Sequence, residues 1–120
     1  LLHLPNEKKS CKRRNKQGCA PNVIHSMDAA HLDLTANAML EKYPGMSFGM
    51  VHDSFGCHAA RMPEMLTSIK ETFVKMYQEN NIIHQIYEDC CSLFGDVTPP
   101  PPELGDFDIT KVLESDYFFS

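Results

Sequence analysis

The sequence predicts an α+β fold in which helices surround a β-hairpin, and two changes of hydrophobic period carry this prediction. Apolar residues recur at helical spacing from Pro21 to Tyr43, whereas the period falls to about two over residues 46–60. From Met62 the helical period returns and continues, with one break, to Phe94. Because a two-stranded hairpin alone is marginally stable, we expect it to belong to a larger antiparallel sheet whose other strands are missing from this chain.

Length and composition are those of a small globular domain. The chain has 120 residues, of which 42% are hydrophobic and 22% are charged. No apolar run reaches the roughly 20 residues that a membrane span needs. The N-terminus also lacks the succession of basic, apolar and small residues that marks a secretory signal. We therefore expect a soluble, intracellular protein without a membrane partner. A first residue other than Met suggests a piece of something longer.

The five cysteines predict neither a disulfide framework nor a zinc ribbon. Their number is odd and no two form a CxxC pair. The spacing of Cys11, Cys19 and His25 fits no common zinc pattern. Reduced, structural thiols are the prediction.

Residues 1–20 are predicted to form a basic connecting segment with an extended backbone, because they are polar and lack an apolar period. The net charge of the chain is −5, which disfavours a nucleic-acid partner, yet this segment can contact phosphates. A solvated, mobile loop is the alternative interpretation. Its basic residues are Lys8, Lys9, Lys12, Arg13, Arg14 and Lys16.

Residues 21–97 form the main predicted unit. Pro21 suits the first turn of a helix, and Pro44-Gly45 ends it. His25 and Asp28 are three residues apart on this helix and so share a face, although an ordinary surface histidine and a first-turn acid would give the same pattern. Two further helices are expected, with inward stripes at Met65, Leu66, Ile69, Phe73, Met76 and Tyr77, and at Ile82, Ile83, Ile86, Tyr87, Cys90 and Phe94.

Residues 98–120 are predicted to be a proline-rich spacer and a docked tail. Four prolines from Pro99 to Pro102 make a stiff spacer, and residues 108–114 can form a short helix. An aromatic end exposed to solvent is a liability, so we expect a groove that receives it. The aromatic residues are Tyr117, Phe118 and Phe119.

The stretch MVHDSFGC places Asp53 at the corner between two predicted strands. A carboxylate on a tight strand-turn-strand is held with little freedom, as a metal ligand requires. Gly49 and Gly56 on either side leave room for another backbone. The alternative is an ordinary turn residue, because Asp and Ser are favoured in turns.

Three segments together resemble the C-terminal end of the single-subunit RNA polymerases, the bacteriophage-type and mitochondrial group. They are PNVIHSMDAAH, VHDSFG and ESDYFFS, in the family's order and approximate spacing. The resemblance covers residues 5–120. It implies that residues 21–97 are the C-terminal portion of the palm and fingers, with the catalytic hairpin at 46–60 in the palm sheet of a right-hand polymerase. The implied activity is template-dependent nucleotidyl transfer.

The resemblance also implies roles for individual residues. Asp53 matches the second of two catalytic aspartates that bind a pair of Mg²⁺ ions, a hard cation that prefers carboxylate oxygens; the other carboxylate is absent from this chain. His52 supports that site. His25 and Asp28 match an HSxD element near the primer terminus, with Asn22 assisting. Phe118 and Phe119 match an aromatic end that folds back toward the active site.

The implied partners are a DNA template, the RNA product and ribonucleoside triphosphates. The chain has no candidate for the first catalytic aspartate or for the helix that holds the triphosphate. We therefore expect it to be inactive without the remaining polymerase, supplied upstream in the same chain or by a split-gene partner. VHDSFG favours the phage subgroup modestly, which would place the protein in the cytoplasm of an infected bacterium; an organellar enzyme would be in the mitochondrion or plastid.

Three alternatives remain at this point. The chain could be a non-catalytic accessory module derived from a polymerase end, which binds a partner independently of Mg²⁺. A family A DNA polymerase fragment is a second, although that family usually has a glutamate after the aspartate, where this chain has Ser54. A small His/Asp hydrolase is the third, and it lacks a nucleophile elbow.

Overall fold

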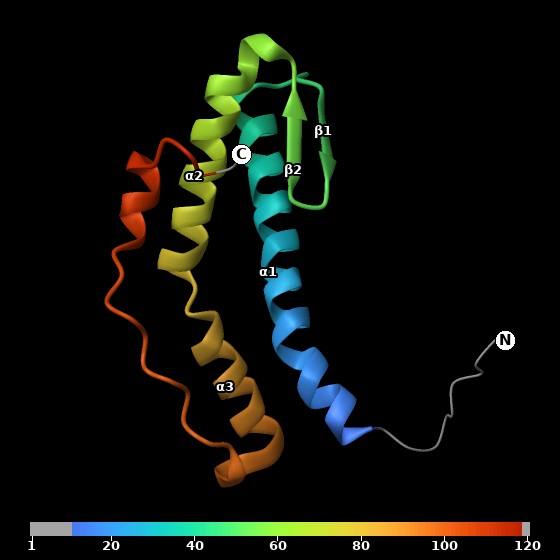
Figure 1. Cartoon of the computed structure of the whole chain (residues 1–120), viewed down its shortest axis with the longest axis vertical. Coiled ribbons are helices and arrows are strands. Elements are labelled where there is room, and N and C mark those ends of the chain that lie inside the picture. Colours follow the sequence, from blue (N-terminus) through green and yellow to red (C-terminus); the bar gives the residue numbers. More distant parts are fainter. Residues whose placement is uncertain (1–10, 119–120) are drawn as a thin grey trace, which may run out of the picture.

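The computed structural model describes residues 11–118, with the side chain of Asp96 excepted. Figure 1 shows two long helices side by side, with a hairpin against one end of the pair and the C-terminal segment returning along the second helix. The α+β prediction is confirmed at the level of helices with one antiparallel hairpin. The helices and strands are α1 (Lys12–Lys42), β1 (Phe48–Val51), β2 (Ser54–Cys57), α2 (Met62–Glu79) and α3 (Ile82–Phe94), with 3-10 turns at Ala59–Arg61, Gly95–Val97 and Ile109–Glu114.

Helix α1 begins at Lys12, so the prediction of an extended backbone is wrong for residues 12–20. Pro21 lies inside the helix rather than at its first turn. Its ring removes one backbone hydrogen bond, but the preceding lysines, arginines and glutamine are good helix formers and allow the helix to continue past it. Residues 1–10 of the predicted connecting segment lie outside the described residues.

The hairpin lies within residues 46–60, where the period of two predicted it. Strands β1 and β2 pair antiparallel, with Phe48 opposite Cys57 and Val51 opposite Ser54. The alternate residues Phe48, Met50, Phe55 and Cys57 are half-buried, and those between them are exposed. This period of two therefore turns one face of the hairpin toward the helices.

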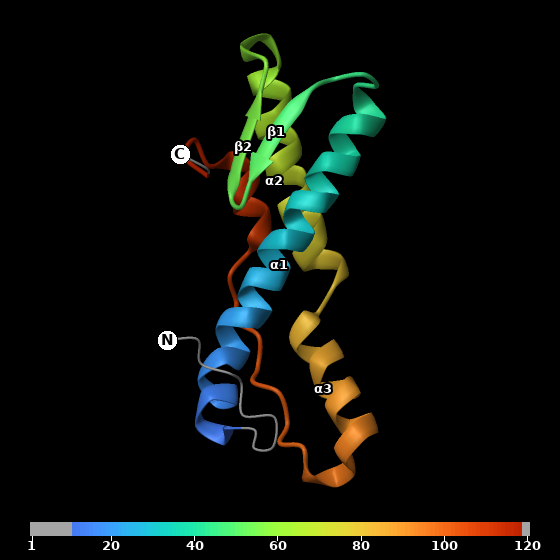
Figure 2. The same ribbon diagram turned by 90° about the vertical axis from the view of Figure 1, so that its right-hand side faces the viewer.

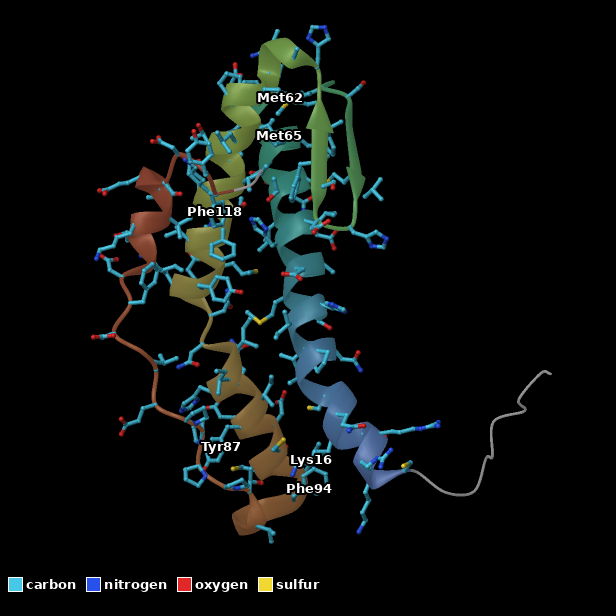
Figure 3. The ribbon with its side chains drawn as sticks, viewed as in Figure 1. Lys16, Met62, Met65, Tyr87, Phe94 and Phe118 are labelled. Atoms are coloured by element: carbon cyan, nitrogen blue, oxygen red, sulfur yellow. The ribbon has the colours of Figure 1, made fainter. Side chains whose placement is uncertain are left out.

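The core is small and lies where α1, α2 and the hairpin meet. Met39, Met65 and Ile69 form its buried centre, and Figure 3 shows Met65 at the level of the hairpin. Only the second half of α1 takes part, because its buried residues are His31, Thr35 and Met39. The partly buried residues around this centre are Tyr43, Met46, Phe48, Phe55, Cys57 and Phe118.

Helix α3 does not turn its apolar stripe inward, contrary to the prediction. Within this described helix no residue is buried, and Ile83 and Phe94 are 45% and 69% exposed. Figure 2 shows the reason: α3 continues away from the hairpin end and so extends past the core. The spacing of the apolar residues predicted the helix correctly. It did not predict which part of the molecule the apolar face packs against.

The C-terminal segment packs on α2 through part of its aromatic end. The rings of Phe118 and Phe73 meet edge to face with centroids 4.8 Å apart. The Lys70 ammonium donates a hydrogen bond to the carbonyl of Ser115. Tyr117 is 89% exposed, so its expected burial is wrong, and Phe119 lies outside the described residues.

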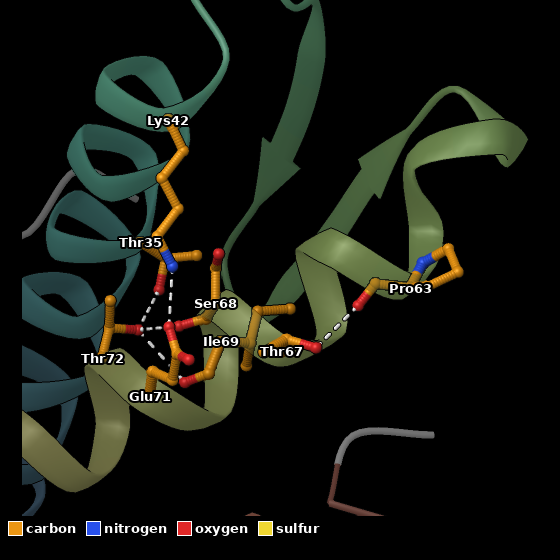
Figure 4. A network of polar contacts seen from close by, with 8 residues as sticks. All are labelled: Thr35, Lys42, Pro63, Thr67, Ser68, Ile69, Glu71 and Thr72. Carbon is orange, nitrogen blue, oxygen red and sulfur yellow. Dashed lines mark hydrogen bonds and ion pairs between the residues drawn. The ribbon is translucent and has the colours of Figure 1, made fainter.

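A buried polar network joins α1 to α2 (Figure 4). The Thr35 and Thr72 hydroxyl oxygens are 2.8 Å apart, and the Thr35 hydroxyl donates to the carbonyl of His31. His31 Nε2 is 2.9 Å from the Ile69 carbonyl oxygen, so this nitrogen carries a hydrogen. Within an interior of low dielectric these bonds fix the register of the two helices.

The helices of residues 11–118 were compared with the length and hydropathy that a membrane span needs. None of them is both long enough and apolar enough to cross a bilayer.

Replacement of Thr72 by valine should lower the free energy of unfolding by about 1–3 kcal/mol, because it keeps the volume but leaves polar atoms of Thr35 and His31 without this partner. The matched control is Thr67→Val. Thr67 is exposed and makes the same kind of hydroxyl-to-carbonyl bond, to Pro63 at 3.0 Å, so its replacement should change stability by less than about 0.5 kcal/mol. Urea unfolding followed by circular dichroism measures both; equal losses would contradict the role of the network.

Candidate functional site

One cleft lies between α1 and the tip of the hairpin. Its volume is about 590 Å³, and a smaller cavity of about 240 Å³, which shares three of its residues, reaches His31 and Phe55. Four predicted site residues from two distant segments meet here. The cleft is lined by His25, Asp28, Ala29, Leu32, Asp33, His52 and Asp53.

Helix geometry explains the α1 side of the cleft. Residues three or four apart lie on the same face of a helix, so His25 and Asp28 point to the same side as Leu32 and Asp33 one turn later. His25 and Asp28 therefore lie on the same face of α1. Asp33 was not predicted, although its spacing of eight residues from His25 is a signal that could have found it.

The hairpin side of the cleft is a two-residue turn, His52-Asp53, enclosed by the Val51 and Ser54 pair. His52 has a φ of 56°, the one positive value among the non-glycine residues of the described chain. Such a backbone costs an L-residue roughly 1–2 kcal/mol, and strained residues of this kind concentrate at functional sites. The strain sits next to the predicted metal ligand.

Asp53 is exposed to the cleft, and none of the ion pairs within residues 11–118 involves it. With Asp28 and Asp33 it makes three carboxylates around one opening. A concave surface of one charge sign concentrates ions of the opposite sign, here cations.

A complete metal site does not form from the described residues alone. Among them, no three His, Cys, Asp or Glu side chains lie close enough to hold one ion, and Cys11, Cys19 and His25 are no exception. The carboxylate of Asp53 nevertheless suits Mg²⁺, which takes oxygen ligands and keeps several waters. The chemistry of Asp53 thus fits a single ligand of such an ion.

His31 lies beneath the cleft and connects it to the core. Its ring meets Phe55 of β2 and Phe73 of α2 edge to face, at centroid distances of 5.9 and 5.4 Å. Burial lowers the pKa of His31 below 6.5, although the Ile69 carbonyl and the charge of Asp28 act in the opposite direction. His31 was not predicted as a site residue, although a histidine at helical spacing from the apolar residues of this helix is a signal that could have found it.

Of the other predicted site residues, Asn22 and Phe118 do not line the cleft. Asn22 is exposed on α1, where its carbonyl accepts a hydrogen bond of 2.8 Å from the Ser26 hydroxyl. Phe118 lies against Phe73, which in turn contacts His31. The tail therefore reaches the cleft only through two intervening rings.

Comparison with known proteins gives a family for the chain. The family model of the DNA-dependent RNA polymerases matches residues 2–98. DNA-directed RNA polymerase 1, mitochondrial, of Arabidopsis thaliana is 46% identical over 90% of this chain. DNA-directed RNA polymerase 2B, chloroplastic/mitochondrial, of Nicotiana tabacum is 37% identical over the whole chain.

The chain covers a different fraction of the length of each relative. It spans 11% of the Arabidopsis enzyme and 12% of polymerase 2B. It spans 68% of DNA-directed RNA polymerase 1A of Nicotiana tabacum, to which it is 40% identical. The names of these relatives are those of organellar enzymes where they state a compartment, and they lend no support to the phage subgroup.

The backbone strain at the turn predicts an unusual response to substitution. His52→Gly should leave the free energy of unfolding within about 0.5 kcal/mol of the wild type, because glycine adopts a positive φ freely. His52→Val should lower it by about 1–2 kcal/mol, since a β-branched residue is poorly tolerated there. Ser54→Val, on the neighbouring strand, is the control and should be neutral or stabilising. A valine at position 52 as stable as glycine would argue against the strain.

The lowered pKa of His31 predicts a stability that depends on pH. The unfolded chain takes up a proton on His31 near pH 6.5, whereas the folded chain does so only at lower pH. Stability is therefore fully present above pH 6.5 and is lost as the pH falls toward the native pKa. His31→Gln should flatten this slope. Urea midpoints across this range provide the measurement; an unchanged slope in His31→Gln would refute the assignment.

Proposed function

Because the chain belongs to the single-subunit, phage-type DNA-dependent RNA polymerases, we propose that it is the C-terminal catalytic portion of such an enzyme. In this role it takes part in template-directed addition of ribonucleotides to an RNA chain. The observation that carries the proposal is the cleft that joins Asp53 on the hairpin turn to His25 and Asp28 on α1. This cleft brings together Asp28 and Asp53, which are 25 residues apart along the chain.

Asp53 would hold Mg²⁺ together with a second carboxylate from the rest of the enzyme. A pair of such ions, when bound, would activate the primer 3′-hydroxyl and neutralise the negative charge of the triphosphate and of the leaving pyrophosphate. The contribution of this chain would be to hold the Asp53 carboxylate in a fixed position. The hairpin fixes Asp53 at a two-residue turn, and the strained His52 sets the direction of that turn.

His25 and Asp28 would bind the primer terminus on the other side of the cleft. An imidazole N–H can donate to the minor-groove edge of the last base pair or to its 2′-hydroxyl, the group that distinguishes RNA from DNA. Asp28 lies one turn from His25 and can orient the ring. Asn22 would contact the same nucleic acid from outside the cleft, and Phe118 would act indirectly by holding Phe73 against His31.

The template, the transcript and the ribonucleoside triphosphates would be partners of the assembled polymerase. The chain alone should not polymerise, because the second carboxylate and the triphosphate-binding helix lie elsewhere, upstream or in a split partner. The mitochondrion or the plastid is the proposed location, since the relatives reported above carry those names.

In the complete polymerase that contains this chain, Asp53→Asn should lower the rate of nucleotide addition by at least about 100-fold, because it removes a charged ligand while keeping the shape of the side chain. Asp106→Asn is the matched control, since Asp106 is exposed and distant from the cleft in sequence. Transcript synthesis from a DNA template with Mg²⁺ measures both variants. Normal synthesis by a folded Asp53→Asn enzyme would favour the accessory module instead.

A further inference from the structure

We infer that the first turns of α1 form a second nucleic-acid contact, which binds the phosphates of the RNA–DNA duplex at a distance from the cleft. This contact, the basic end of α1, consists of Lys12, Arg13, Arg14 and Lys16. The choice of nucleic acid rather than an acidic protein surface as its ligand rests on the proposed function.

The positive charges of the basic end destabilise the helix that carries them. A helix carries partial positive charge at its N-terminus, which disfavours cations there. No acidic residue occurs in the first turn of α1, and the first acid along the helix is Asp28. Lys16 is also four residues from Lys12 and three from Arg13, spacings at which like charges repel.

No acidic side chain of the described chain offsets these charges. All four basic residues are exposed, and each of the ion pairs within residues 11–118 lies elsewhere. Four uncompensated cations within five residues span about 6 Å of helix. Duplex nucleic acid offers about one charge per 1.7 Å, so the cluster can meet several phosphates at once.

Packing does not hold this part of α1 either. The buried residues of the helix begin at His31, and between Cys11 and Asn22 only Gly18 is even half-buried. Figure 3 shows Lys16 at the opposite end of the molecule from Met65 in the core. Because most helices are stabilised by a packed face, a half-helix without one needs another source of stability. A polyanion that neutralises the basic end provides it.

The distance to the cleft fits a single extended ligand. Lys16 and His25 are nine residues apart, which is about 14 Å along the helix, and Lys12 is about 20 Å from His25. A duplex whose primer terminus lies at His25 therefore passes within reach of the basic end if it follows α1. The two arginines add planar donors that bind phosphate oxygens in pairs.

The test compares two double variants with the same change of charge. Lys12→Gln with Lys16→Gln removes half of the basic end, and Lys75→Gln with Lys111→Gln removes two exposed lysines from α2 and the C-terminal segment. Each is measured in the complete polymerase by fluorescence anisotropy with a labelled RNA–DNA hybrid, in EDTA, over a series of NaCl concentrations. Circular dichroism checks that the helices remain.

The slope of log affinity against log salt should fall by about 1 for each lost phosphate contact, hence by about 2 for the α1 variant and not at all for the control. Equal slopes in the two variants would overturn the inference, as would an α1 variant that binds the hybrid normally but no longer assembles with the rest of the polymerase. Because binding is measured without Mg²⁺, this result is independent of the Asp53→Asn assay, so either proposal can fail alone.

Discussion

The contact on which the rest of the structure depends is the buried hydrogen bond between His31 of α1 and the Ile69 carbonyl of α2. The same imidazole packs against Phe55 of the hairpin and against Phe73, which holds Phe118 of the tail. One residue of α1 thus contacts α2 and the hairpin directly and reaches the tail through the ring of Phe73. Because a buried polar group without partners is costly, its bonds permit few other arrangements of these segments. The cleft has its shape because α1 and the turn are fixed on either side of this ring.

Helix α1 combines two regions with different tasks. From His25 onward it presents His25, Asp28 and Asp33 to the cleft, and its buried residues contribute to the core. Its first turns are exposed and basic. The net charge of −5 therefore hides a separation of charge, with cations at one end of the helix and carboxylates around the cleft. In the polymerase role proposed above, this separation would keep phosphate ligands and metal ions apart.

The sequence predicted those parts of the structure that depend on local patterns. The hairpin, the position of Asp53 and the start of α2 followed from a change of period and from turn residues. The start of α1 was missed because Pro21 was interpreted as a first-turn residue, when it is tolerated inside the helix. The stripe of α3 was predicted to be buried because periodicity reports amphipathicity but not the partner. His31 and Asp33 were missed as site residues because their role depends on tertiary contacts.

The central claim is that Asp53 holds a metal ion within reach of the α1 face that carries His25. Fe²⁺ in place of Mg²⁺ in the complete polymerase, with ascorbate and peroxide, would generate hydroxyl radicals at the ion, and mass spectrometry would locate the cut backbone. The account predicts cuts at the 52–54 turn and along 25–33, lost in Asp53→Asn and retained in Asp106→Asn. Cuts that persist in Asp53→Asn, or that spare both segments, would contradict it.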